Sequence, residues 1–317
     1  MIVLNRFLDF SLIKFPIVFP LIYLYALYSF PSYENFLIIF TILILAETHF
    51  GATWPFFISK YNTTYIKENK LNLIIVPIII IVFSIIAYFN FQNIFLLAFF
   101  MANVYHVTRQ SVGICKLYNK KQDEFEIQKY LIYFFALLFF FIAFLKFYLS
   151  LNLISNFNLT FICSLLILFS IIFYIYFYKF NENLFCLITG ILIFFPVCFL
   201  ENPVHLIIMG VTMHYSQYIA MTYKVTVARN LKNKIINNSK TNIFDYFNIY
   251  FFCIIILYSS VMSYISYYTK DTINPNLILI PIIGQFLHFY LDSQLWKFSI
   301  KHNVENVLKN LRFNTTQ

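Results

Sequence analysis

Histidine is the residue of this chain best suited to chemistry, because four of its six histidines lie inside long apolar runs. These are His49, His106, His214 and His288. An ionisable side chain is costly to keep inside a bilayer, so an intramembrane histidine indicates a functional site. Imidazole binds zinc, copper, iron or nickel, and facing helices of a bundle can bring several imidazoles together. The four histidines therefore predict a metal site.

The elements that must position these histidines are transmembrane helices. Of the 317 residues, 61% are hydrophobic and 11% are charged, which excludes an ordinary soluble protein. Ten apolar runs come near the roughly 20 residues that cross a bilayer. They cover about 13–30, 35–58, 71–89, 93–115, 130–150, 158–178, 183–200, 202–223, 246–267 and 276–299. We expect an all-α, polytopic integral membrane helix bundle of about ten transmembrane helices, with 1–317 as a single membrane domain.

The charges of the loops predict the orientation of these helices. If alternate connections face the same side, most of the 22 basic residues gather on one side, and positively charged loops stay in the cytoplasm. Both termini should then be cytoplasmic, in a multi-pass protein of the cell inner membrane. The net charge of +9 follows from this pattern and needs no nucleic acid. The lipid bilayer is the expected partner, and the sequence makes no prediction of the oligomeric state.

The same topology places the four histidines at one depth. His49, His106, His214 and His288 lie about 12–14 residues from the starts of four helices that run in the same direction, a spread of ~3 Å along the helix axis. In the alternative, each imidazole separately bonds a neighbouring carbonyl or hydroxyl group. The matched depths favour one shared metal site.

Polar side chains near two of the histidines complete the predicted catalytic set. Asp292 follows His288 by four residues and shares its helix face, so it could orient a ligand, bind the metal or carry protons. Gln217 and Tyr218 follow His214 within about one turn. We therefore assign catalytic roles to Asp292, Gln217 and Tyr218.

Other polar residues receive structural roles. His205 and His302 fall outside the matched depth and are expected to be surface or interface residues. Glu47 points to a different helix face from the nearby histidine, and we expect it to pair with an interior cation such as Arg109.

Four short segments resemble the Brp/Blh family of membrane β-carotene 15,15′-dioxygenases. They are Thr48-His49-Phe50-Gly51, Tyr105-His106-Val107-Thr108, Met213-His214-Tyr215-Ser216-Gln217-Tyr218 and Leu287-His288-Phe289-Tyr290-Leu291-Asp292. The resemblance implies a histidine-ligated ferrous iron (Fe2+) that uses dioxygen to cleave a polyene. The family's third segment resembles His-x-x-x-His, whereas Tyr218 follows His214 here, so His288 would complete the iron site.

These features predict an iron-dependent membrane oxygenase that acts on a lipophilic small molecule, such as a carotenoid cleaved to retinal. The alternative is a proton- or cation-coupled transporter that uses the same buried His/Asp cluster, because intramembrane ionisable groups mark both classes. The chain has no phosphate-binding loop and no nucleophile elbow. Iron follows from the resemblance alone, since imidazoles also suit zinc or copper.

Overall fold

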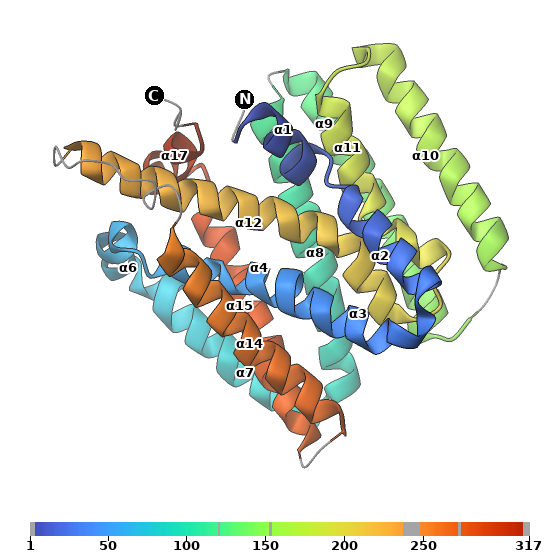
Figure 1. The fold of residues 1–317 in the computed structure, drawn as a ribbon, viewed down its shortest axis with the longest axis horizontal. Helices are drawn as coiled ribbons and strands as arrows, with labels where there is room; N and C mark the ends of the chain where they lie inside the picture. Colours follow the sequence, from blue (N-terminus) through green and yellow to red (C-terminus); the bar gives the residue numbers. More distant parts are fainter. Residues whose placement is uncertain (1–3, 120, 152–153, 237–247, 272–273, 313–317) are drawn as a thin grey trace. The chain divides into compact units, whose positions relative to one another are not determined.

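The described part of the chain is helical. The computed structural model describes residues 4–119, 121–151, 154–236, 248–271 and 274–312, and among these residues it contains no strand. The helices, which Figure 1 labels, form two compact units. Unit 1 comprises Met1–Ile38 and Val104–Gln217, and unit 2 comprises Ile39–Asn103 and Tyr218–Gln317. The single membrane domain stays a prediction.

Unit 1 contains the N-terminal helices and α9 to α11, together with parts of α8 and α12. Its elements are α1 (Arg6–Asp9), the π-helix η1 (Phe10–Lys14), α2 (Val18–Ser29), η2 (Pro31–Tyr33), the start of α3 (Glu34–Thr41), the end of α8 (Gln92–Tyr118), α9 (Gln122–Ala143), η6 (Phe144–Tyr148), α10 (Asn156–Tyr178), α11 (Asn183–Leu192), η7 (Phe195–Cys198) and the first part of α12 (Pro203–Ile236).

Unit 2 contains the remaining helices. Its elements are the end of α3, the π-helix η3 (Ile42–Ala46), α4 (Glu47–Gly51), α5 (Thr53–Phe57), η4 (Lys60–Asn62), α6 (Thr63–Glu68), η5 (Leu71–Ile75), α7 (Val76–Asn90), the start of α8, the end of α12, α14 (Ile249–Asp271), η8 (Pro275–Ile278), α15 (Leu279–Leu295), α16 (Lys301–Asn303), η9 (Val304–Leu308) and α17 (Lys309–Leu311). Within this unit α14 packs on α4, and α15 packs on α7.

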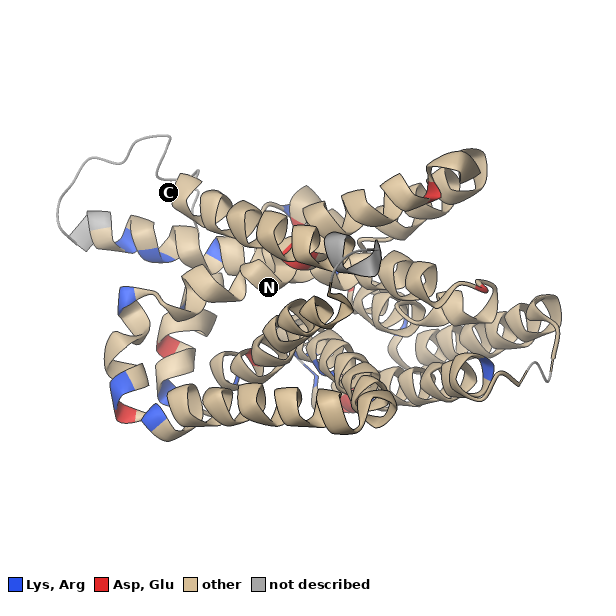
Figure 2. Ribbon diagram, turned by 90° about the horizontal axis from the view of Figure 1, so that it is seen from below, with Lys and Arg blue, Asp and Glu red and all other residues tan. Residues whose placement is uncertain are grey.

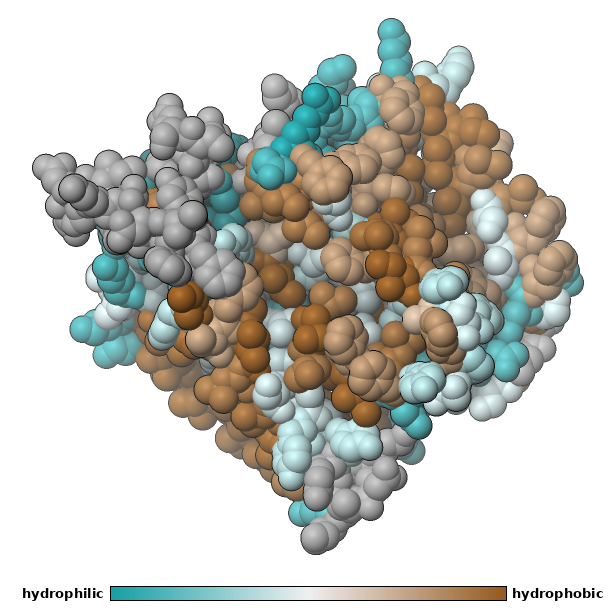
Figure 3. All heavy atoms as spheres, in the orientation of Figure 1, coloured by the Kyte–Doolittle hydropathy of each residue, from teal (hydrophilic) through white to brown (hydrophobic). Residues whose placement is uncertain are grey.

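Five described helical segments are long and apolar enough to cross a membrane. They are Pro31–Phe57, Leu71–Asn90, Gln122–Tyr148, Asn156–Tyr178 and Ile249–Tyr267, and the bent pair Arg6–Lys14 with Val18–Ser29 makes a sixth if it is one span. Figure 2 shows long helical stretches without a charged residue, and Figure 3 shows hydrophobic side chains over much of one face. Exposed phenylalanines on α10 include Phe157 and Phe169. Such a surface indicates a membrane protein.

The expected run at 183–200 is not one helix. α11 ends at Leu192, and the short helix η7 follows, with Pro196 near its start. Proline has no backbone N–H and cannot continue an α-helix. α8, α12 and α15, which carry three of the four histidines, are not among the five apolar segments, since polar residues interrupt them and α15 has only 17 residues.

The first helix of unit 1 breaks at Pro16. The segments Arg6–Lys14 and Val18–Ser29 meet at 59°. Such a break leaves the last carbonyl groups of the first segment without N–H partners from their own helix. Three side chains from α11 and α12 donate to these carbonyls: Thr189 Oγ1 to Lys14 (2.8 Å), Gln217 Nε2 to Ile13 (2.6 Å) and Ser216 Oγ to Leu12 (3.2 Å). The carbonyl groups at the break thus receive their hydrogen bonds from protein side chains, as an apolar environment requires.

Thr189→Val tests this account. We expect the variant to lower the free energy of unfolding by about 1–3 kcal/mol, because it leaves a buried carbonyl without a donor. Thermal unfolding in detergent measures the loss. Ser170→Ala is the control, since that hydroxyl bonds only the carbonyl of Leu166 in its own helix. An equal effect of both substitutions would contradict the role given to Thr189.

Candidate functional site

In unit 2, His49 and His288 lie against each other. The centroids of their rings are 4.4 Å apart, and each side chain is buried. His49 belongs to α4 and His288 to α15, and these two helices are in contact. The aromatic rings of Phe50 and Tyr218 pack on the pair, with centroid distances of 5.1 Å to His288 and 4.8 Å to His49. The pair is therefore enclosed by aromatic side chains.

Asp292 lies beside this pair. Its Oδ2 atom is 3.8 Å from Nε2 of His288, as the spacing of four residues on one helix predicts. The hydroxyl of Tyr218 donates to Oδ1 of Asp292 at 2.5 Å. Two of the predicted catalytic residues, Asp292 and Tyr218, are thus brought together with two predicted metal ligands in one unit.

Thr53 is a member of this cluster that sequence reasoning missed. Its Oγ1 lies 2.6 Å from Nδ1 of His288 and 2.9 Å from the hydroxyl of Tyr218. It also lies 3.5 Å from Oδ1 of Asp292, and the side chain is fully buried. The available signal was its position four residues after His49, on the same helix face.

In unit 1, His106 on α8 and His214 on α12 form the second pair. Their ring centroids are 5.6 Å apart with the planes at 89°, and both side chains are buried. Gln217, the third predicted catalytic residue, donates through its amide to the carbonyl of Ile13 at the helix break. The structure thus gives Gln217 a contact that stabilises the fold.

Both pairs fit the geometry of metal ligands. A ring centroid lies about 3 Å from an ion that is bound through nitrogen, so two rings on one ion have centroids roughly 4.5–6 Å apart. The separations of 4.4 Å for His49 and His288 and 5.6 Å for His106 and His214 are close to this range. Imidazoles with a carboxylate such as Asp292 suit ferrous iron, zinc or copper. The residues present within each unit therefore fit such an ion.

His205 was expected to be a surface or interface residue, and the structure buries it at an interface between helices of unit 1. Its Nδ1 lies 2.7 Å from the hydroxyl of Tyr23, and its Nε2 lies 2.6 Å from Oε1 of Glu34. Only 3% of the residue is exposed. These two hydrogen bonds join α12 to α2 and α3, which makes His205 a link between helices.

His302 is partly buried in unit 2, where it packs between polar residues. Its ring stacks on Tyr65, with centroids 4.1 Å apart and planes at 8°. Nε2 of His302 lies 3.0 Å from Oδ1 of Asn62, and the amide of Asn306 donates toward Nδ1 at 3.2 Å. An oxygen facing one nitrogen and an amide donor facing the other suit the neutral imidazole.

The stability of unit 2 should therefore depend on the charge of His302. Burial first, and then the guanidinium of Arg229, lower the pKa of His302 below 6.5, while Glu305 and Glu68 act in the opposite direction. A lowered pKa in the folded state means that the unfolded chain takes up the proton first, so stability should fall as the pH drops below about 6.5. We expect a shallower fall of the melting temperature with acid in His302→Gln. Identical slopes in the two proteins would contradict this assignment.

The expected pairing of Glu47 with Arg109 assumed that Arg109 lies in the interior, and this assumption is wrong. Arg109 is exposed, with its guanidinium 5.9 Å from the ring of Tyr105, and is not an interior cation. Glu47 is buried, and its Oε1 accepts a hydrogen bond from Gln285 at 3.3 Å. An amide on α15 is therefore the observed partner of this carboxyl group.

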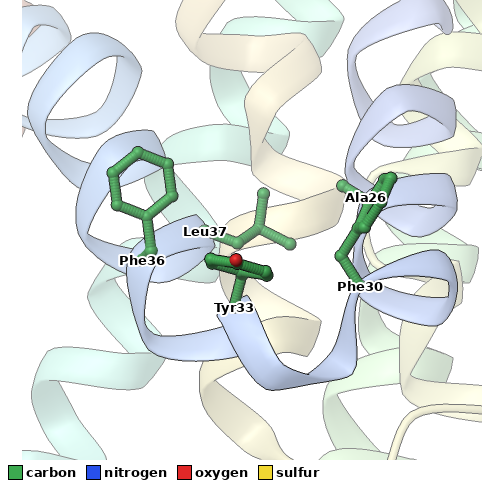
Figure 4. Close-up of a pocket in the computed structure, with 5 residues that line it drawn as sticks. All are labelled: Ala26, Phe30, Tyr33, Phe36 and Leu37. Atoms are coloured by element: carbon green, nitrogen blue, oxygen red, sulfur yellow. The ribbon is translucent and has the colours of Figure 1, made fainter.

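A cavity of about 250 Å³ lies in unit 1, at the turn between α2 and α3. Ala26, Phe30, Tyr33, Phe36 and Leu37 line it (Figure 4). The lining is apolar, as expected for a lipophilic ligand, but it includes none of the predicted site residues. We therefore do not assign this cavity to the predicted metal site.

Comparisons with known proteins leave the family open. No protein-family model matches the chain, and no curated protein or solved structure matches it significantly. The resemblance to the carotenoid dioxygenases therefore stays a prediction, supported by the four segments quoted above.

Proposed function

We propose that the chain is an integral-membrane iron oxygenase that acts on a lipophilic substrate, with oxidative cleavage of a carotenoid such as β-carotene to retinal as the first candidate reaction. In this proposal His49, His106, His214 and His288 bind one ferrous iron. The observation that carries it is the pairing of these residues: each unit holds two of the four as a buried pair, and one pair lies beside Asp292.

The membrane topology is part of the proposal. Ten transmembrane helices, with both termini in the cytoplasm of a cell with an inner membrane, would make the four helices that carry histidines run in one direction. The histidines would then share one depth, within ~3 Å. The sequence supports this topology through the loop charges and the ten apolar runs.

The residues around His288 would prepare it to hold the ion. Bound ferrous iron would supply the redox chemistry by which dioxygen reacts with a polyene. The hydrogen bond between Thr53 and Nδ1 of His288 fixes the ring, so that Nε2 is turned toward Asp292. The hydroxyl of Tyr218 donates a hydrogen bond to Asp292, and this bond holds the carboxylate in place. Phe50 and the other aromatic rings of this unit would exclude water and accommodate an apolar substrate.

Metal analysis followed by an oxygen-uptake assay tests the proposal. The protein is purified in detergent without added metal, and its iron, zinc and copper are measured per chain. We expect about one iron per chain and oxygen uptake that requires both iron and a polyene such as β-carotene. A folded protein that contains no metal and takes none up would rule out the oxygenase.

Buried carboxyl groups favour a second candidate, a proton- or cation-coupled transporter. Glu47 and Asp292 are each 2% exposed within unit 2, and intramembrane carboxyl groups are typical of ion pathways. Purified protein in liposomes distinguishes the two candidates. A proton or cation flux that persists after chelation of metals would favour transport.

A further inference from the structure

Arg229 is a buried cation without an acidic partner among the described residues. It lies in the C-terminal part of α12, in unit 2, and is only 3% exposed. Its Nε donates to the carbonyl of Asn306 at 3.0 Å. Its Nη2 is buried, and no group in the described part of the chain accepts a hydrogen bond from it. A buried charge is ordinarily paired with an opposite charge, so this guanidinium is a candidate binding site for an anion.

The surroundings of Arg229 hold the guanidinium in one position. It lies over the ring of Phe56 at 4.7 Å and that of Tyr61 at 5.2 Å. The hydroxyl of Tyr61 donates to the main-chain carbonyl of Arg229 at 2.8 Å. With Nε bonded to Asn306 and a face on aromatic rings, the terminal nitrogens are the part left to bind a ligand. Burial lowers the pKa of Arg229 to about 10, so the group stays charged at neutral pH.

Other cations lie near Arg229. Lys232 follows it by three residues on the same helix face, and Lys309 is close enough to lower the pKa of Lys232, after burial as the larger cause. In Figure 2, basic residues lie along the C-terminal part of α12, which belongs to unit 2. The nearby acids Glu68 and Glu305 act on His302, and neither forms an ion pair with Arg229. The field at this end of unit 2 therefore favours an anion.

We infer that Arg229 anchors an anion site in unit 2 that binds a phosphate group through the terminal nitrogens of its guanidinium. A planar guanidinium fork matches two oxygens of a phosphate, and desolvated charge-assisted hydrogen bonds of this kind are strong. The phosphate belongs either to the head group of an anionic phospholipid or to a soluble phosphate compound. The site is independent of the proposed iron chemistry.

Thermal unfolding of the delipidated full-length protein tests the site and distinguishes the two sources. One arm adds inorganic phosphate and compares it with chloride at equal ionic strength, which removes any effect of screening. The other adds phosphatidylglycerol and compares it with phosphatidylcholine. Saturating ligand should raise the melting temperature by roughly 5 °C. A rise with phosphatidylglycerol alone identifies a lipid, and a rise in both arms shows that free phosphate suffices.

Arg229→Lys is the main variant, because it keeps the charge but loses the planar fork, and Arg229→Gln removes the charge as well. Arg312→Gln is the matched control, an exposed arginine of the same unit. We expect Arg229→Lys to need at least tenfold more ligand for the same rise and the control to behave as the wild type. No rise in the wild type in either arm would overturn the inference, as would an unchanged response of Arg229→Lys.

An internal ion pair is the competing explanation. Asp245 is the acidic residue of segment 237–247, which lies outside the described residues. If Arg229 pairs with it, Asp245→Asn should lower the melting temperature of the protein and phosphate should not raise that of the wild type. That combination would also overturn the phosphate site.

Discussion

Gly210→Ala is expected to prevent unit 1 from folding normally. A Cβ atom at Gly210 on α12 would lie 1.8 Å from the carbonyl oxygen of Ile193 and 2.9 Å from its carbonyl carbon. These are backbone atoms just after α11, so no side-chain rotation can relieve the overlap. Such overpacking costs at least about 3 kcal/mol where the backbone must move. We expect a large fall in melting temperature or no recoverable folded protein.

Gly113→Ala is the matched control for this substitution. A Cβ atom there would meet no other group within 4 Å, although Gly113 lies in α8, one of the helices that carry a candidate ligand. Alanine is favoured over glycine inside a helix by about 1 kcal/mol, so this variant should be as stable as the wild type or slightly more stable. A mild effect of Gly210→Ala, comparable with that of Gly113→Ala, would show that α12 does not approach Ile193 as the structure describes.

Apolar runs predicted several helices to within a few residues. The expected run at 71–89 corresponds to Leu71–Asn90, and that at 158–178 corresponds to Asn156–Tyr178. The breaks were harder to predict, because they depend on groups distant in sequence. Thr189 donates a hydrogen bond to the carbonyl of Lys14, which is 175 residues away in sequence, and no local pattern predicts that contact. The prediction of one helix at 183–200 was wrong for a local reason. Pro196 interrupts the helix, and hydropathy alone does not take proline geometry into account.

The candidate site was predictable where its residues share a helix. The spacing of His288 and Asp292 placed the two side chains on one face, and the structure confirms that they are close. Thr53 was missed because its partner His288 is 235 residues away, and a threonine in an apolar run usually bonds its own helix. The choice between a surface and an interface position for His205 stayed open, because sequence could not reveal that Tyr23 and Glu34 face it in the folded chain.

Removing one histidine from either pair is expected to eliminate bound iron. We predict about one iron per chain in the wild type and background levels in both His288→Ala, from unit 2, and His106→Ala, from unit 1. The reason is that a metal site loses most of its affinity for iron when one of its imidazole ligands is removed. Asp292→Asn should have a smaller effect, a 10–100-fold weaker affinity, if Asp292 supports the ligands without being one of them. Metal analysis of folded, purified variants gives each value.

The two remaining histidines provide the controls. His205 and His302 have hydrogen-bond partners of their own within units 1 and 2, so His205→Gln and His302→Gln should keep their iron. Loss of iron in His288→Ala alone would mean that the metal belongs to unit 2, with Asp292 as a ligand. Loss in all four variants would indicate general destabilisation instead of ligation. Equal loss from His106→Ala and His288→Ala, with both controls intact, requires that the two pairs serve the same ion, which is the step on which the oxygenase proposal depends.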